Sequence, residues 1–172
     1  MIPLPGDHFP AVTGSTLHRR PGDRPLKIRP VTESDLPEVL RLDEQAFPEG
    51  PYTYDILRQW LDVCGERLLV ADDGRALHGY IAVAATPNAT RTWILSLAVA
   101  PVHRGHGLGR RLMLETLRHL RSDGVREVWL TVAPSNTTAI VLYRSLGFAP
   151  VGGIHEDYLG PGRDRLVLML SL

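Results

Sequence analysis

Three glycines stand close together in the stretch HRGHGLG, residues 103–109, directly before the apolar-patterned run RRLMLETLRHL. Glycine weakens both helices and strands, so this cluster indicates unusual backbone angles or a ligand that approaches the backbone closely. The stretch lies between a buried strand pattern and a helix pattern, and the N–H groups at a helix start attract anions. Arg104, Arg110 and Arg111 add positive charge. These residues predict a site for the phosphates of a nucleotide-like cofactor.

Two common phosphate-binding loops do not fit this stretch. A P-loop needs a lysine followed by serine or threonine after its last glycine, and here two arginines follow Gly109. The dinucleotide fingerprint needs a third small residue where this chain has Leu112, and an acid at the end of the next strand, whereas Glu127 stands at its start. From this stretch alone, a glycine-rich turn that binds nothing remains an alternative.

Two motifs together point to a known family. VAPVHRGHGLGRRLM resembles motif A of the Gcn5-related N-acetyltransferase (GNAT) superfamily, with Arg104, Gly107 and Gly109 at its R/Q-x-x-G-x-G/A positions. Downstream, SNTTAIVLYRSLGF is similar to motif B, and its matching residues are Asn136, Ala139, Leu142, Tyr143, Gly147 and Phe148. The resemblance covers residues 27–172 and implies direct acyl transfer from acetyl-coenzyme A (acetyl-CoA) to a primary amine.

The same resemblance implies where acetyl-CoA binds. Its pantetheine arm would lie between two splayed strands, and its pyrophosphate would bind the glycine turn. The implied cofactor contacts are Leu97, Ala98, Val99, Arg104, Gly105, His106, Gly107, Leu108, Gly109, Arg110, Asn136 and Tyr143. The Val99 N–H is the implied oxyanion donor, and Tyr143 is the implied general acid, since a phenol can protonate a thiolate at neutral pH. Helix packing of Tyr143 and helix capping by Asn136 are the structural alternatives.

Within the superfamily, the chain is most similar to the bacterial ribosomal-protein N-terminal alanine acetyltransferases. The stretch DEQAFPEGPYTYDIL resembles their substrate loop, and HEDYLGPGRDRLVLML resembles their C-terminal loop and last strand. This similarity implies a peptide groove lined by Phe47, Pro48, Tyr52 and Tyr158. Packing of these aromatic residues within their loops is the structural alternative.

One departure from that branch concerns the general base. The branch has L-E-V-R-x-S-N where this chain has LTVAPSN, so Thr131 stands at the glutamate position and Ala133 at the arginine position. A threonine hydroxyl cannot act as a base near neutral pH, so Thr131 is expected only to contact the substrate. Glu156 is the expected catalytic base, with Glu49, His155 and Asp157 as alternatives in the substrate loops, or a chain of water molecules. The departure leaves two further functions open: acetylation of a small amine, or acyl-CoA sensing without catalysis.

Length and composition set broader limits. The chain has 172 residues, with 44% hydrophobic and 22% charged residues, which is typical of one soluble domain. Lysine plus arginine and aspartate plus glutamate number 19 each, which argues against a nucleic-acid binder that depends on a global positive field.

Localisation and partners are also predicted from the sequence. The single cysteine, Cys64, and the lack of a signal peptide or membrane-length apolar run predict a cytoplasmic protein without membrane contact. His103 and His106 have no third ligand, so no metal is expected. The expected partners are acetyl-CoA and an amine, and the protein is expected to be a monomer or a homodimer.

Hydrophobic periodicity and turn residues predict a single α/β domain over residues 27–172, preceded by a flexible, proline- and glycine-rich arm over residues 1–26. The domain is expected to have the GNAT fold, with a mixed sheet of about six to seven strands and helices on both faces. The predicted helices cover residues 32–47, 54–64, 108–122 and 136–148. Predicted strands cover residues 26–31, 67–72, 76–85, 92–100, 126–133, 150–157 and 165–172.

Overall fold

The computed structural model describes residues 25–172, and the predicted arm lies outside the described residues apart from its last two positions. The described chain contains four α-helices: α1 (Leu36–Ala46), α2 (Tyr54–Cys64), α3 (Leu108–Ser122) and α4 (Thr137–Ser145). Its seven strands are β1 (Lys27–Pro30), β2 (Leu68–Asp72), β3 (Leu77–Ala85), β4 (Arg91–Val99), β5 (Glu127–Val132), β6 (Ala149–His155) and β7 (Arg165–Ser171). Every helix and strand predicted from the sequence is present, with boundaries that differ by a few residues.

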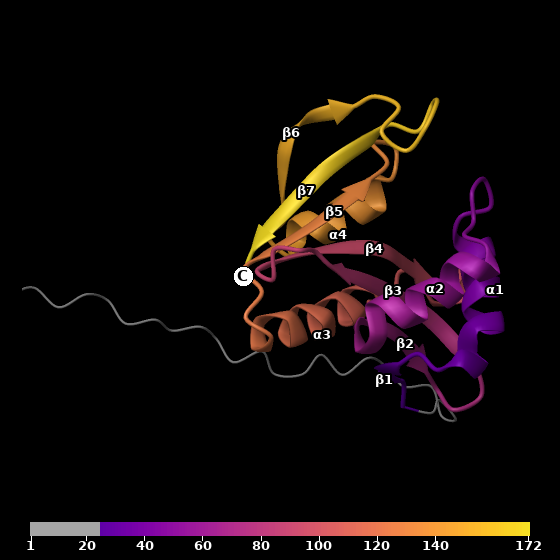
Figure 1. Cartoon of the computed structure of the whole chain (residues 1–172). Coiled ribbons are helices and arrows are strands. Elements are labelled where there is room, and N and C mark those ends of the chain that lie inside the picture. Colours follow the sequence, from indigo (N-terminus) through magenta and orange to yellow (C-terminus); the bar gives the residue numbers. More distant parts are fainter. Residues whose placement is uncertain (1–24) are drawn as a thin grey trace, which may run out of the picture.

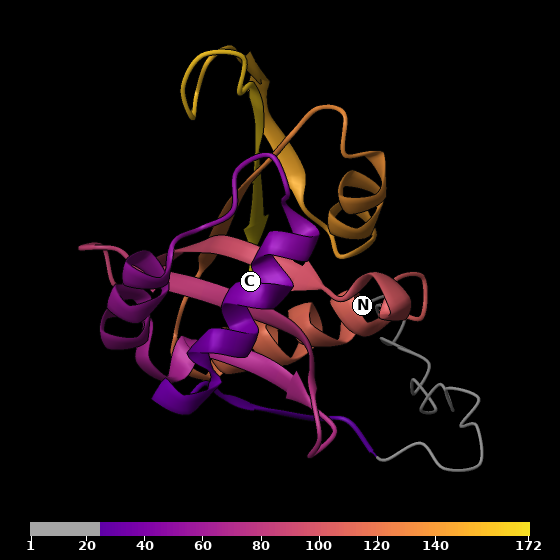
Figure 2. The same ribbon diagram turned by 90° about the vertical axis from the view of Figure 1, so that its right-hand side faces the viewer.

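All of these strands belong to one mixed sheet in the order β1-β2-β3-β4-β5-β7-β6. Only the central pair, β4 and β5, is parallel, and α3 connects its two strands. Helices α1 and α2 cover one face of the sheet, and α3 and α4 cover the other (Figures 1 and 2). The predicted fold class, a mixed sheet with helices on both faces, is confirmed.

Strand side chains alternate between two hydrophobic cores, as the two-residue period of a strand requires. In β2, Leu69 and Ala71 pack on the α3 and α4 side, whereas Leu68 and Val70 pack on the α1 and α2 side. Because the central strands are covered on both faces, their sequences are almost continuously apolar.

A β-bulge in β4 interrupts the regular ladder near the middle of the sheet. Ser96 pairs with Ala82, but the next pair joins Ile94 to Val83, so Leu95 is an extra residue without a partner. The parallel pairing of β4 with β5 also ends here, since its last pair joins Ile94 to Leu130. Residues 95–99 of β4 therefore separate from β5, which confirms the predicted splayed strands.

Across residues 25–172, no helix has the length and apolar character that a bilayer crossing would need. The same residues contain no group of three or more histidine, cysteine, aspartate or glutamate side chains placed to hold a metal ion.

Candidate active site

The glycine turn connects the free end of β4 to the start of α3. Gly105 and Gly107 adopt left-handed backbone angles, with φ of 76° and 80°, and a Cβ atom at either position would meet no atom within 4 Å. These two glycines are therefore required by backbone conformation rather than by lack of space. Gly107 is the N-cap of α3, and no side chain caps this helix. The N–H groups of its first turn are thus available to an anion.

Gly109 has a different role, because it lies where three elements converge. A Cβ atom on Gly109 would lie 3.5 Å from Leu142 Cδ2, 3.7 Å from Val99 Cγ2 and 4.0 Å from Leu97 Cδ2. These neighbours belong to α4 and to the separated part of β4. A small residue here leaves room between the start of α3 and the gap between the strands, where a larger side chain would intrude.

The three arginines around the turn are held by oxygens of the protein itself. Arg104 Nε donates to Val99 O at 3.1 Å, and Arg110 Nη1 donates to Ser145 Oγ at 2.8 Å. Arg111 Nη2 donates to Leu26 O at 2.7 Å. The positive charges predicted for this region are therefore fixed around the helix start, and Arg104 also joins the turn to the edge of β4.

The backbone of β4 presents hydrogen-bonding groups to the gap. Ala100 N donates to His78 O of the β3 side at 2.9 Å, so the alternation along a strand directs the backbone groups of Val99 and Leu97 to the opposite edge, towards β5. The bond from Arg104 to Val99 O agrees with this direction. The backbone groups of Ala98 face β3, where this residue pairs with Tyr80. Leu97 and Val99 are therefore the residues whose backbone groups border the gap.

Tyr143 lies on α4 with its ring inside the core on the α3 and α4 side. Its side chain is buried, and its ring centroid lies 5.9 Å from that of Phe148. Burial raises the pKa of the Tyr143 hydroxyl to about 12, so the group is protonated at neutral pH. The hydroxyl makes no hydrogen bond to any residue within the described range, which leaves its proton available to a substrate atom.

Two polar residues flank the gap on the β5 side. Asn136 is the N-cap of α4, and its side chain accepts a hydrogen bond from Ala139 N at 3.1 Å, so the capping role considered above is confirmed. Thr131 is the first residue of β5 beyond the last pair with β4, and it lies opposite Val167 of β7. Thr131 is thus placed at the point where the gap opens.

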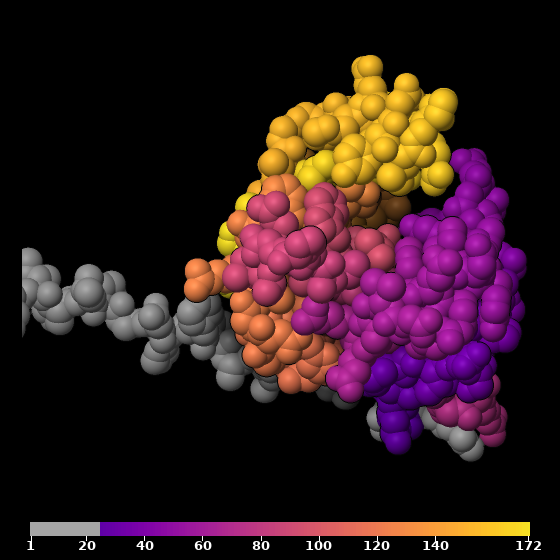
Figure 3. All heavy atoms as spheres, viewed as in Figure 1, coloured from indigo at the N-terminus to yellow at the C-terminus, as the bar shows by residue number. Residues whose placement is uncertain are grey.

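Two loops face each other on the other side of the gap. One loop, residues 47–53, joins α1 to α2, and the other, residues 156–164, joins β6 to β7. Figure 3 shows a hollow between the yellow β6–β7 segment and the purple α1–α2 segment. We call this hollow the acceptor cleft, because the loops predicted to contact the substrate form its two sides.

The aromatic residues predicted for a peptide groove occupy both loops. Phe47 ends α1 and packs against the core on the α1 and α2 side, while Pro48 is exposed. The ring of Tyr52 contacts Trp60, with centroids 4.4 Å apart, and burial raises the pKa of Tyr52. Tyr158 is exposed, and its ring centroid lies 5.8 Å from that of His155. The structure thus places the predicted residues on both sides of the cleft.

Glu156, the expected base, is exposed at the start of the β6–β7 loop. Its carboxylate forms no ion pair or hydrogen bond with any residue that the structure describes. Glu49 is likewise exposed in the opposite loop. The base assignment therefore remains a prediction.

A buried polar network beneath the acceptor cleft was missed by the sequence analysis. The Asp43 carboxylate of α1 is completely buried and accepts hydrogen bonds from Tyr80 OH at 2.5 Å and from Tyr52 N at 2.6 Å. Tyr80 OH also lies 2.9 Å from Ser96 Oγ. Burial, followed by the charge of Asp43, raises the pKa of Tyr80. The network fixes the α1–α2 loop to the centre of the sheet.

One sequence signal could have indicated that Asp43 is buried. Asp43 lies seven residues after buried Leu36, so the two residues share one face of the helix.

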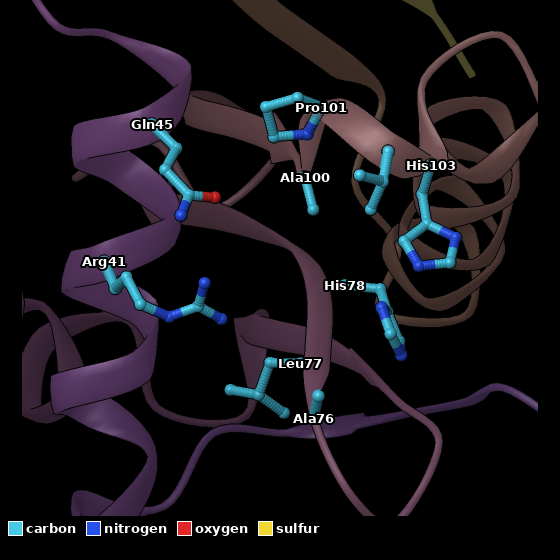
Figure 4. Close-up of a pocket in the computed structure, with 9 residues that line it drawn as sticks. Arg41, Gln45, Ala76, Leu77, His78, Ala100, Pro101 and His103 are labelled. Atoms are coloured by element: carbon cyan, nitrogen blue, oxygen red, sulfur yellow. The ribbon is translucent and has the colours of Figure 1, made fainter.

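A separate cavity of about 410 Å³ lies between α1 and the end of β4. In Figure 4, Arg41 and Gln45 of α1 face His78, Pro101 and His103 across this cavity. None of the residues predicted for the active site lines it, and it lies on the β3 side of β4 rather than in the gap.

The known proteins that this chain resembles include several acetyltransferases. The model of the Acetyltransferase (GNAT) family matches residues 35–148. The chain is 39% identical over 127 residues to mycothiol acetyltransferase of Saccharopolyspora erythraea, which covers 69% of this chain but 41% of that protein. The chain thus spans less than half the length of that relative.

A second relative is matched along almost its whole length. The chain is 32% identical over 149 residues to the [ribosomal protein bS18]-alanine N-acetyltransferase of Escherichia coli K12, covering 83% of this chain and 94% of that protein. The crystal structure of the ribosomal-protein-S18-alanine N-acetyltransferase from Escherichia coli superposes with a TM-score of 0.73 at 25% identity, covering 85% of this chain and 93% of that chain.

Proposed function

The chain belongs to the GNAT acetyltransferase family, and we propose that it transfers the acetyl group of acetyl-CoA to the N-terminal amine of a peptide or protein. The observation that carries the proposal is the continuous path from the uncapped start of α3, along the separated edge of β4, to Thr131 at the acceptor cleft. This path offers an anion site, a row of backbone hydrogen-bonding groups and an opening for a second substrate.

Each step of the reaction has a candidate group in this chain. The amine attacks the thioester carbonyl, and the Val99 N–H faces the gap where it can donate to the developing oxyanion. The Leu97 N–H borders the same gap, where it can donate a hydrogen bond to the acetyl-CoA that lies beside β4. As the C–S bond breaks, the proton of Tyr143 goes to the departing thiolate. The proton of the attacking amine leaves through Glu156 or through water, and an α-amine with a pKa near 8 needs less help than a lysine side chain.

The acceptor cleft supports a peptide rather than a polyamine. Its two sides are separate loops, and the side chains that the structure places around Tyr52 include two arginines, Arg163 and Arg165, whose charges lower the pKa of Tyr52 against the effect of burial. Beside Tyr52, these two guanidiniums would repel a positively charged polyamine. The match to mycothiol acetyltransferases supports a small-molecule amine as the second candidate.

The test is release of CoA thiol from acetyl-CoA with a panel of acceptors: short peptides with free N-termini, the same peptides with blocked N-termini, and small amines. We expect turnover with free peptides only. Turnover restricted to small amines would make the second candidate correct. Acetyl-CoA binding without turnover of any acceptor would contradict both and favour an acyl-CoA sensor.

The helix start provides a sharp prediction about cofactor binding. We expect Gly107→Ala to raise the dissociation constant of acetyl-CoA about tenfold or more, because a Cβ atom at φ of 80° strains the turn that presents the N–H groups of α3. Calorimetric titration with acetyl-CoA measures this effect.

Gly124→Ala is the matched control for that variant. Gly124 has φ of 77° just after the other end of α3, and a Cβ atom there would also meet nothing within 4 Å. Both variants should lose a similar stability, about 1–2 kcal/mol, but only Gly107→Ala should weaken binding. Equal acetyl-CoA affinity in the two variants would contradict the assignment of the helix start as the phosphate site.

A further inference from the structure

Two arginines with no acidic partner stand at the acceptor cleft. Arg163 belongs to the β6–β7 loop, and Arg165 is the first residue of β7. Neither guanidinium forms an ion pair with a carboxylate within the described residues, whereas Arg29, for example, pairs with Asp35 at 2.7 Å. What distinguishes these two arginines from other unpaired ones is that both act on Tyr52 in the opposite loop.

Arg163 joins the two loops of the cleft. A Cβ atom built on Gly50 would lie 3.3 Å from Arg163 Nη2 and 3.6 Å from its Cζ, so the guanidinium lies against the α1–α2 loop. Both arginines also act on Tyr52 in that loop, because their charges oppose the rise in its pKa. The positive charge is thus directed to the space between the loops.

Arg165 lies on the same face of the sheet as Thr131. Thr131 pairs with Val167, and residues 165 and 167 of one strand point to the same face. Leu166 and Leu168, which alternate with them, pack in the core on the opposite face. Two residues of a strand span about 7 Å, so Arg165 lies about that far along the sheet from the opening of the gap.

Two acidic residues of the β6–β7 loop, Asp157 and Asp164, shape the loop through hydrogen bonds to its backbone. Asp164 Oδ1 accepts from Asp157 N at 2.9 Å, and Asp157 Oδ1 accepts from Gly162 N at 2.6 Å. Asp164 forms no ion pair with either neighbouring guanidinium, although its charge acts on Arg165, whose Nη1 donates to the Asp164 backbone oxygen at 2.8 Å. Burial, followed by the charge of Arg163, lowers the pKa of Arg165, so the two like charges are close enough to disfavour each other. A bound anion would relieve this repulsion.

We propose that the acceptor carries a carboxylate close to its reacting amine, and that Arg163 and Arg165 bind this carboxylate as specificity-determining residues. The proposal rests on the acetyl transfer proposed above and specifies its acceptor. A guanidinium pair suits a carboxylate because its N–H groups match the two oxygens. The separation of about 7 Å corresponds to two residues of an extended peptide, which places an acidic side chain at the second or third residue of the acceptor.

The experiment compares acceptors that differ only in this carboxylate. The probes are Ala-Glu-Gly-Gly-amide and Ala-Gln-Gly-Gly-amide, with free alanine and alaninamide as a second pair that tests an amino-acid carboxylate as the source. We expect kcat/KM to be about tenfold or more higher with the glutamate peptide than with the glutamine peptide. In the Arg163→Gln/Arg165→Gln double variant, this ratio should fall to about one, with little change for the glutamine peptide.

Two control variants separate recognition from structure. Arg121→Gln removes the same charge from an exposed position on α3 and should keep the preference. Arg165→Lys keeps a positive charge and should retain part of the preference for the glutamate peptide. If Arg165 had a purely structural role, the preference would not depend on the charge at this position. Loss of activity with both peptides equally in the double variant would overturn the proposal, as would equal use of both peptides by the wild type.

Binding of the acetylated products keeps the proposal testable without turnover. Calorimetry with CoA present should show acetyl-Ala-Glu-Gly-Gly-amide binding about tenfold more tightly than its glutamine counterpart, and the double variant should abolish the difference. Equal binding of the two products would overturn the proposal. If neither the peptides nor the small amines release thiol, the proposed function fails; if acceptors react without regard to the carboxylate, only this inference fails.

Discussion

Tyr143→Phe should lower kcat by about a hundredfold or more while the dissociation constant of acetyl-CoA changes less than about twofold. The substitution removes one oxygen from a buried ring and leaves its packing against Phe148 unchanged. A general acid acts only as the thiolate leaves, so its loss affects turnover rather than substrate binding. Steady-state kinetics and calorimetric titration measure the two quantities.

Tyr54→Phe is the matched control, since Tyr54 is 46% exposed on α2 and makes no hydrogen bond to a described residue through its hydroxyl. Tyr54→Phe should leave both quantities unchanged.

The pH profile adds an independent readout: with a pKa raised to about 12, Tyr143 stays protonated below that pH and loses its proton only above it. Wild-type kcat should therefore show no decline caused by Tyr143 up to pH of about 10. Full activity of Tyr143→Phe across the pH range would contradict the general-acid role.

Asp43→Ala should lower the free energy of unfolding by about 2–3 kcal/mol and raise the KM for the acceptor. The variant leaves Tyr80 OH and Tyr52 N–H without the carboxylate that both contact in the buried network. The α1–α2 loop then loses its connection to the sheet, while the glycine turn on the other side of β4 is untouched. Acetyl-CoA affinity should consequently stay within about twofold of the wild type. Chemical denaturation and steady-state kinetics check these outcomes.

Asp62→Ala provides the comparison for Asp43. Asp62 lies on α2 with its side chain 69% exposed, and among residues 25–172 it pairs only with Arg58, so its loss should cost less than about 1 kcal/mol. Asp43→Asn should be milder than Asp43→Ala, because an amide can still accept from Tyr52 N. An Asp43→Ala protein as stable as the Asp62→Ala protein would show that the network does not hold the loop.

Local signals predicted the helices and strands because each signal acts within one element. Apolar alternation predicted the strands, and Gly147, with φ of 94°, ends α4 as expected of a C-cap glycine. The glycine cluster also predicted unusual backbone angles in the turn, and Gly105 and Gly107 adopt left-handed angles that only glycine takes without strain. The helical period could indicate that Asp43 is buried, but it could not show its partners, since Tyr80 and Ser96 stand 37 and 53 positions further along the chain.

The amino-acid sequence by itself determined the order of the elements, the glycine turn at the start of α3 and the two motifs that relate the chain to its family, because these features depend on neighbouring residues. Only the tertiary structure decided where β4 separates from β5, because the bulge at Leu95 exists only in the pairing of β4 with β3. The structure alone also brought Arg163 against Gly50, which stands 113 positions earlier in the chain. A cleft between distant loops has no local signal, since its charge and shape come from side chains that meet only when the sheet is assembled.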